Sequence, residues 1–357
     1  MSKLLTVFGA TGNQGGALLN YVLQHPKLSE VYKLRGVTRD VTKESAVAFT
    51  KRGVEMGDMD DVESLKRILA GSYAVFSMTQ CTYSPPLPRQ EVIILAASCT
   101  CNSFADRSTE TVWEKMSFES EVAQGKNIAD ASVAAGATLI IWSSLPNVTE
   151  MTGGKLSNVH HFDSKAKVEA YIRTLSIKSV FYMPAFFMQT IRDNFKPRRD
   201  NEGILRFSLG WPSDTPVPVI DVSDTGRYIA PVLLSAAEGS PEKYHHKSFS
   251  CATAYYTADD LIAEWKKVTG YDIRYVPLDA VSETTVLTET PNSTTGLTSY
   301  MQQVMKESKG LITEYGFYGP TGRSDVQWAL EQMELVGEKP TTWEEFVRAN
   351  EPWFEEA

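Results

Sequence analysis

The sequence predicts an α/β protein built on a doubly wound parallel sheet, followed by a smaller α/β lobe. Three observations carry this prediction. Apolar strand-like runs alternate with helix-like stretches through the first half of the chain, the first strand ends in a glycine-rich turn, and the alternation loosens after Pro184, where several prolines interrupt it. Strands that alternate with helices pair in parallel through right-handed crossovers.

The elements of the first half follow from hydrophobic periodicity. Strands are predicted at residues 4–8, 31–38, 54–56, 74–78, 138–142 and 180–183. Helices are expected at residues 17–24, 46–51, 62–70, 118–136 and 168–175. The 118–136 helix carries mostly small residues on its contact face, which indicates close packing against a neighbour.

The second half is less regular. We expect a first domain over residues 1–190 and a smaller substrate or partner lobe over 191–357, packed on the first. Thr257 with Asp260 three residues later opens a helix that ends at Gly270, and another helix begins near Thr341. The aromatic residues of this lobe are expected in its core.

One segment does not fit the pattern. Thirty-eight residues separate Met78 from Ser117, whereas a connection from strand to helix has about 2–6 residues. An atypical insertion is therefore predicted over about residues 80–112. It is either an ordered lid at the sheet edge or a segment that is disordered or retained in the gene model by error. Its clustered prolines and Ser/Thr-rich tract favour the second interpretation.

Composition excludes several classes of function. The chain has 44 acidic and 35 basic residues, a net charge of −9, so nucleic acid is not expected as a direct partner. The apolar runs are too short to span a membrane. The four cysteines form neither a disulfide framework nor a metal site. A cytoplasmic protein is expected, with the nucleus as the other possible location.

The glycine-rich turn predicts a dinucleotide site. It lies between the first strand and the first helix and contains Gly9, Ala10, Thr11, Gly12, Asn13, Gln14, Gly15 and Gly16. In such a turn one glycine permits the tight bend, one lets the backbone approach a pyrophosphate, and one lets the helix pack against the strand. The helix N-terminus then offers free N–H groups to the phosphates.

The second strand favours NADP(H) over NAD(H). Its tip carries Arg39, whose guanidinium can bind a 2′-phosphate in a bidentate manner. Asp40 could instead neutralise Arg39. After the third strand, Asp58 could accept a hydrogen bond from adenine or cap the following helix.

Several motifs together resemble the NmrA-like family, an atypical branch of the short-chain dehydrogenase/reductase superfamily. They are GATGNQGG at 9–16, VTRD at 37–40, GDMDD at 57–61, AQGKNIADASVAAG at 123–136 and HFDSKAKVEAYIR at 161–173. The resemblance implies a Rossmann domain with a small C-terminal lobe and NADP(H) binding. Some relatives look like redox-sensing regulators that bind transcription factors, and others look like reductases, including many of fungal secondary metabolism.

The same resemblance indicates which residues are catalytic. The superfamily uses Ser, Tyr and Lys, and here Ser144 follows the fifth strand while His161 and Lys165 occupy the Tyr and Lys positions. The resemblance also implies that Lys165 binds the cofactor by holding its nicotinamide ribose. Each has a plainer interpretation. Ser143 and Ser144 could only satisfy backbone groups, His161 could lie in a mobile surface loop, and Lys165 could be a solvated helix residue.

Two functions therefore remain open. The first is an NADPH-dependent oxidoreductase that reduces a small carbonyl, imine or activated alkene, with Lys165 and either Ser144 or His161 polarising the acceptor. The alternative is a non-catalytic NADP(H)-binding redox sensor that acts on a transcription factor.

Overall fold

The large sheet of the computed structural model has the strand order of a doubly wound fold. The structure describes residues 2–58, 62–79, 110–277 and 299–353. Seven parallel strands follow the order β11-β6-β5-β4-β1-β2-β3. They are β1 (Lys3–Phe8), β2 (Tyr32–Thr38), β3 (Glu55–Asp58), β4 (Ala74–Ser77), β5 (Leu139–Ser143), β6 (Lys178–Pro184) and β11 (Lys247–Cys251). The predicted Rossmann-type sheet is confirmed.

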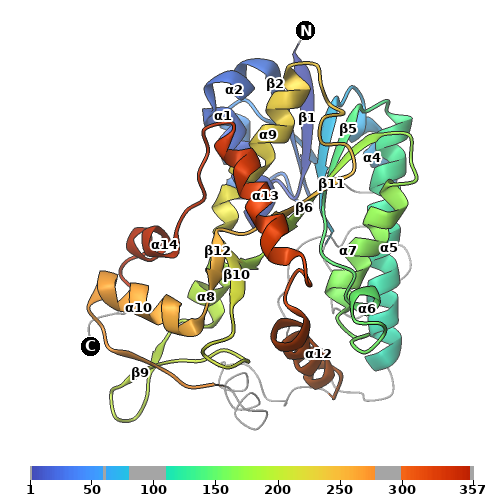
Figure 1. The fold of residues 1–357 in the computed structure, drawn as a ribbon. Helices are drawn as coiled ribbons and strands as arrows, with labels where there is room; N and C mark the ends of the chain where they lie inside the picture. The colour runs from blue at the N-terminus through green and yellow to red at the C-terminus, as the bar shows by residue number, and fades with distance from the viewer. Residues whose placement is uncertain (1, 59–61, 80–109, 278–298, 354–357) are drawn as a thin grey trace.

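Helices cover both faces of this sheet (Figure 1). One face carries α1 (Asn13–Gln24), α2 (Pro26–Val31), α3 (Glu44–Lys51), α9 (Thr225–Ala237) and α13 (Gly322–Glu334). The other carries α4 (Val62–Leu69), α5 (Glu110–Ala134) and α7 (His160–Ile172), the last preceded by the short α6 (Val148–Met151). The inner strands β1, β4, β5 and β6 are mostly buried between the two layers, which explains their continuous apolar runs.

The contact between α5 and α7 is unusually close. A Cβ on Gly125 would lie 2.6 Å from Val168 Cγ2 and 2.9 Å from Trp142 Cη2. The small residues predicted on the contact face of α5 therefore let this helix approach α7 and β5. This packing later decides which polar groups meet beside Lys165.

The smaller lobe has its own core. It contains the three-stranded sheets β12-β10-β7 and β13-β9-β8. Their strands are β7 (Phe186–Phe187), β8 (Arg198–Arg199), β9 (Leu205–Phe207), β10 (Val217–Ile220), β12 (Ala254–Tyr256) and β13 (Ile273–Tyr275). Trp265 lies at the centre of the lobe, with ring centroids of Trp343 and Trp353 at 5.3 and 4.6 Å. The expectation that these aromatics are core residues is confirmed.

The helices of this lobe begin as the sequence predicts. They are α8 (Met188–Asn194), α10 (Ala258–Thr269) and α14 (Trp343–Ala349). Thr257 and Asp260 form a capping box at the start of α10, and Gly270 ends this helix with a φ of 75°. The remaining elements are the 3₁₀ turn η1 (Val222–Asp224), α12 (Ser299–Gly310) and the π-helical turn η2 (Leu311–Tyr315).

Two features add to the sequence predictions. Val31 ends the short helix α2 rather than beginning β2, because Pro26 and the His25 side chain start a helical turn there. β11, α9 and α13 come from residues after 190 but pack on the large sheet, so the division at 190 stays a prediction.

Most of the predicted insertion, residues 80–109, lies outside the described residues, and α5 begins at Glu110.

Candidate functional site

The glycine turn brings β1 and α1 together as the sequence logic requires. Gly9 has a φ of +67°, in the left-handed region that favours glycine. Gly12 N donates to Gly9 O at 2.8 Å, and Ala10 N donates to Val37 O at 3.1 Å, which fastens the turn to β2. A Cβ on Gly15 would lie 2.4 Å from Gly9 O, so only glycine lets α1 begin this close to the turn.

The start of α1 fits a phosphate group. Gly12 is the N-cap and has no capping side chain, and the first turn holds no acidic residue. The first N–H groups of a helix lack intrahelical partners and lie at its positive end. A cavity of about 500 Å³ opens here, with Thr11, Gly12 and Asn13 among its lining residues. The residues present therefore suit the pyrophosphate of a dinucleotide.

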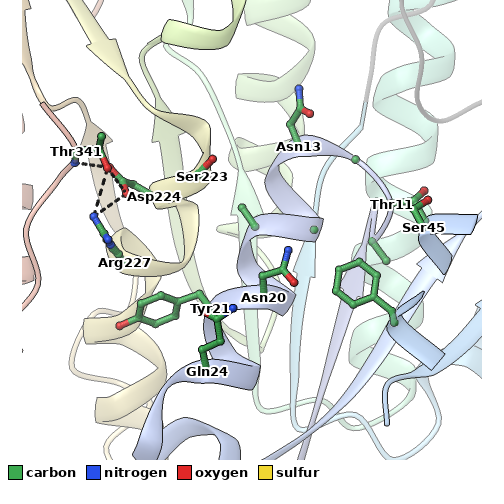
Figure 2. A pocket seen from close by; sticks show the side chains of 15 residues that line it. Thr11, Asn13, Asn20, Tyr21, Gln24, Ser45, Ser223, Asp224, Arg227 and Thr341 are labelled. Atoms are coloured by element: carbon green, nitrogen blue, oxygen red, sulfur yellow. Dashed lines mark hydrogen bonds and ion pairs between the residues drawn. The ribbon is translucent and has the colours of Figure 1, made fainter. Parts of the chain in front are cut away.

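This cavity extends along the outer side of α1 (Figure 2). Thr11 and Ser45 lie on one side of the helix, and Asp224, Arg227 and Thr341 lie on the other. Asp224 accepts hydrogen bonds from Thr341 N at 2.6 Å and Thr341 Oγ1 at 3.0 Å, and it pairs with Arg227 at 3.0 Å. Burial raises the pKa of Asp224 to about 6. These contacts fasten α9 to the segment before α14.

The tip of β2 leaves Arg39 available. The Asp40 carboxylate accepts from Thr42 N at 2.8 Å and Thr42 Oγ1 at 2.5 Å, and these hydrogen bonds lower the pKa of Asp40. Arg39 makes no hydrogen bond or ion pair with the described part of the chain. Asp40 is thus occupied by its own turn and not by Arg39. Asp58 lies beside Thr38 in the β2–β3 register, at the carboxyl edge of the sheet.

The two serines after β5 have different surroundings. Ser143 Oγ donates to Gln14 Oε1 at 2.8 Å, which connects the end of β5 to the first turn of α1. Ser144 is buried, its N–H donates to Tyr182 O at 2.8 Å, and its hydroxyl faces Leu145 O at 3.5 Å. Of the predicted cofactor residues, Gln14 therefore has its side chain engaged with β5.

Lys165 lies in an ion pair and is mostly buried. Its side chain is 14% exposed, and Nζ lies 2.8 Å from Glu121 Oε1 and 3.1 Å from the carbonyl oxygen of His161. Trp142 Nε1 donates to Lys165 O at 3.1 Å, which ties this turn of α7 to β5. This turn of α7 is therefore fixed against β5, while its ammonium is held by Glu121 of α5.

His161 belongs to the first turn of α7 and not to a loop. Burial and, to a smaller extent, the positive charge of Lys165 lower the pKa of its imidazole to about 3. The ring is therefore neutral near pH 7. A neutral imidazole can accept a proton but does not supply one as an imidazolium does.

Glu121 is the site residue that sequence reasoning missed. Its carboxylate is held by Lys165 and by the hydroxyls of Thr79 and Ser164. A signal was present, because Glu121 lies three residues after Phe118 and four before Gly125, on the contact face predicted for this helix. A charged residue on a buried helix face requires a partner.

Two classes of site have no support in the described residues. Within the ranges given above, no three His, Cys, Asp or Glu side chains are grouped so that they could hold a metal ion. Among the helices that the structure describes, none is both long and apolar enough to cross a bilayer.

Comparison with known proteins agrees with this geometry. The model of the NmrA-like family matches residues 1–100 and 107–347. The NmrA-like family domain-containing oxidoreductase FrzB of Cladobotryum sp. is 26% identical over 295 residues, covering 78% of this chain and 77% of FrzB.

Two solved structures share the fold. The negative transcriptional regulator NmrA superposes with a TM-score of 0.71 at 16% identity, covering 98% of this chain and 95% of NmrA. The triphenylmethane reductase of Citrobacter sp., crystallised with NADP(H), gives 0.63 at 18% identity, covering 97% of this chain and 99% of the reductase. With the family model matching most of its length, the chain belongs to the NmrA-like family.

Proposed function

We propose that this chain is an NADPH-dependent oxidoreductase that reduces a small carbonyl, imine or activated alkene in fungal secondary metabolism. The observation that carries the proposal is the Lys165 ammonium, held by Glu121 on a turn of α7 whose backbone is tied to β5. The relative FrzB is named an oxidoreductase, and the triphenylmethane reductase was crystallised with NADP(H).

The glycine turn and Arg39 would hold the cofactor. The N–H groups at the start of α1 suit the pyrophosphate. Arg39 is available for the 2′-phosphate that distinguishes NADPH from NADH. Bound NADPH supplies a hydride, two electrons and a proton, to the electrophilic carbon of the acceptor.

Lys165 then has a defined task. As the acceptor carbon gains the hydride, negative charge develops on its oxygen or nitrogen, or at the far end of an alkene. The Lys165 ammonium stabilises this charge and gives up a proton to it, and water restores the lysine proton. His161 is neutral near pH 7, so it takes no part as the acid.

A second cavity suits the acceptor. It has a volume of about 430 Å³ and is lined by Tyr255, Ile312, Gly319 and Arg323, among others. The loop that lines this cavity, residues 316–320, lies beside the start of α7, because Phe317 in that loop packs on Phe162 with ring centroids 5.3 Å apart. The Arg323 guanidinium lies 4.4 Å from the centre of the Tyr255 ring. This mixed lining favours a small acceptor with both a flat apolar part and a polar group.

Steady NADPH consumption with a panel of aldehydes, ketones, imines and enones tests the proposal. We expect turnover with at least one class. Lys165→Met should reduce kcat by about 100-fold or more, while NADP⁺ affinity in calorimetry stays close to that of the wild type. Tight nucleotide binding without turnover of any acceptor would reject the reductase and favour the redox-sensing regulator, whose fold NmrA shares.

A further inference from the structure

Glu121 gathers three donors from separate parts of the chain. Thr79 Oγ1, just after β4, donates to Glu121 Oε1 at 2.9 Å. Ser164 Oγ, on α7, donates to Oε2, and Lys165 Nζ donates to Oε1 at 2.8 Å. The Glu121 side chain is only 1% exposed. A buried carboxylate is costly unless it is paired and hydrogen-bonded, and both of its oxygens are bonded here.

The pair is asymmetric in its exposure. Glu121 is covered, whereas Lys165 retains 14% of its side-chain surface. The ammonium has three N–H donors, and two of them are directed at Glu121 and at the carbonyl oxygen of His161. The third N–H of the Lys165 ammonium has no hydrogen-bond partner among the described residues. A purely structural ion pair does not require one end to keep access to solvent and a donor to spare.

We propose that Glu121 is a positioning residue that keeps Lys165 protonated and in place, with Thr79 and Ser164 holding the Glu121 carboxylate. This inference rests on the proposed function of the same site. Hydroxyl donors stabilise a carboxylate in its charged form, and that charge in turn stabilises the ammonium beside it. The cluster joins the segment after β4 and the middle of α5 to the turn of α7 that carries Lys165.

The charged and titratable groups that face Lys165 are few in the described residues. Glu121 faces it from α5, and His161 lies one turn away on α7 itself. The imidazole of His161 is neutral near pH 7, so the charge of Glu121 dominates the surroundings of the ammonium. Removing that charge should therefore lower the pH at which Lys165 loses its proton.

The first experiment needs no cofactor. Lys165 is labelled with an amine-specific reagent over a range of pH, and the modified peptide is quantified by mass spectrometry. Glu121→Gln should move the labelling midpoint to lower pH. Glu169→Gln is the matched control, because Glu169 is a buried α7 carboxylate paired with Arg173 at 2.6 Å. It removes a charge one helical turn from Lys165 that is already paired with Arg173, so it should move the Lys165 midpoint far less.

The second experiment measures kinetics with NADPH and the best acceptor of the panel. Glu121→Gln should reduce kcat by about 10-fold to 100-fold, with little change in KM. The alkaline limb of the kcat profile should fall together with the labelling midpoint. Glu121→Asp should restore part of kcat because it restores the charge. If Glu121→Gln does not fold, as circular dichroism would show, Thr79→Val and Ser164→Ala should each move both quantities in the same direction by less.

The outcomes separate the two proposals. A folded Glu121→Gln protein with an unchanged labelling midpoint overturns the inference. A shifted midpoint with unchanged kcat and an unchanged alkaline limb also overturns it, because the pair is then only structural. If the wild type turns over no acceptor, the proposed function fails, and the midpoint alone decides whether Glu121 keeps Lys165 protonated.

Discussion

Replacing Gly15 by alanine tests the cofactor turn most directly. The added Cβ would lie 2.4 Å from Gly9 O and 2.7 Å from both Gly9 C and Phe8 O. All three are backbone atoms, which cannot rotate away as a side chain can. An ordinary contact begins at 3.4 Å, so the turn and α1 must separate by about 1 Å, a form of overpacking.

The size of the effect follows from two opposing terms. Overpacking costs about 1–3 kcal/mol, and alanine in place of glycine within a helix recovers about 1 kcal/mol. The free energy of unfolding should therefore fall by up to about 2 kcal/mol. Nucleotide binding should suffer more, because displacing one charge-assisted N–H donor from the phosphate costs about 1.5–3 kcal/mol, a rise of roughly 10-fold to 150-fold in Kd.

Calorimetry with NADP⁺ and denaturant unfolding measure the two quantities. Gly16→Ala is the matched control, since its Cβ would lie 3.2 Å from Ala10 O and requires a shift of only a few tenths of an ångström. It should change both quantities far less. A Gly15→Ala protein with the Kd and unfolding free energy of the wild type would refute the reasoning.

Three further predictions concern other parts of the molecule. Arg39→Ala should raise the Kd of NADPH by about 10-fold to 150-fold and leave NADH nearly unchanged, with Lys51→Ala as the equal-charge control; equal losses for both nucleotides in calorimetry would contradict this. Burial raises the pKa of Asp224 from 3.8 to about 6, so its contribution to stability is complete below the unfolded value and is lost as pH rises through the folded value. The unfolding free energy of the wild type relative to Asp224→Asn should thus fall by about 2–3 kcal/mol across that window, and a difference independent of pH would reject the assignment. Trp265→Ala should cost about 3–5 kcal/mol in denaturant unfolding, because Trp265 is fully buried in the lobe core; a loss below 1 kcal/mol would show that the core is not built around it.

Much of the fold could be predicted from local sequence. The glycine turn, the six strands of the first half and the capping box at Thr257 each depend on a few consecutive residues, whose backbone preferences and burial period act wherever the segment lies. The contact of Asp40 with Thr42 is also local, and an Asx turn could have been predicted from the two-residue spacing.

The site depended on packing between distant segments. Glu121 and Lys165 are 44 residues apart, and they meet only because Gly125 lets α5 approach α7. The neutral state of His161 follows from burial by elements that its own segment does not contain. β11 joins the large sheet beside β6, although the intervening chain builds part of the lobe.

The sequence by itself determined the doubly wound sheet, the phosphate turn and the basic tip of β2, because backbone geometry and apolar periodicity are written in neighbouring residues. Only the tertiary structure decided which polar side chains are partners. Lys165 could be solvated or paired on the evidence of its helix alone, and the pairing with Glu121 emerged from the packing of two helices on one sheet. Local backbone and burial preferences determine the helices and strands. The partners of a buried charge depend instead on which groups the packed helices and strands bring within hydrogen-bond distance.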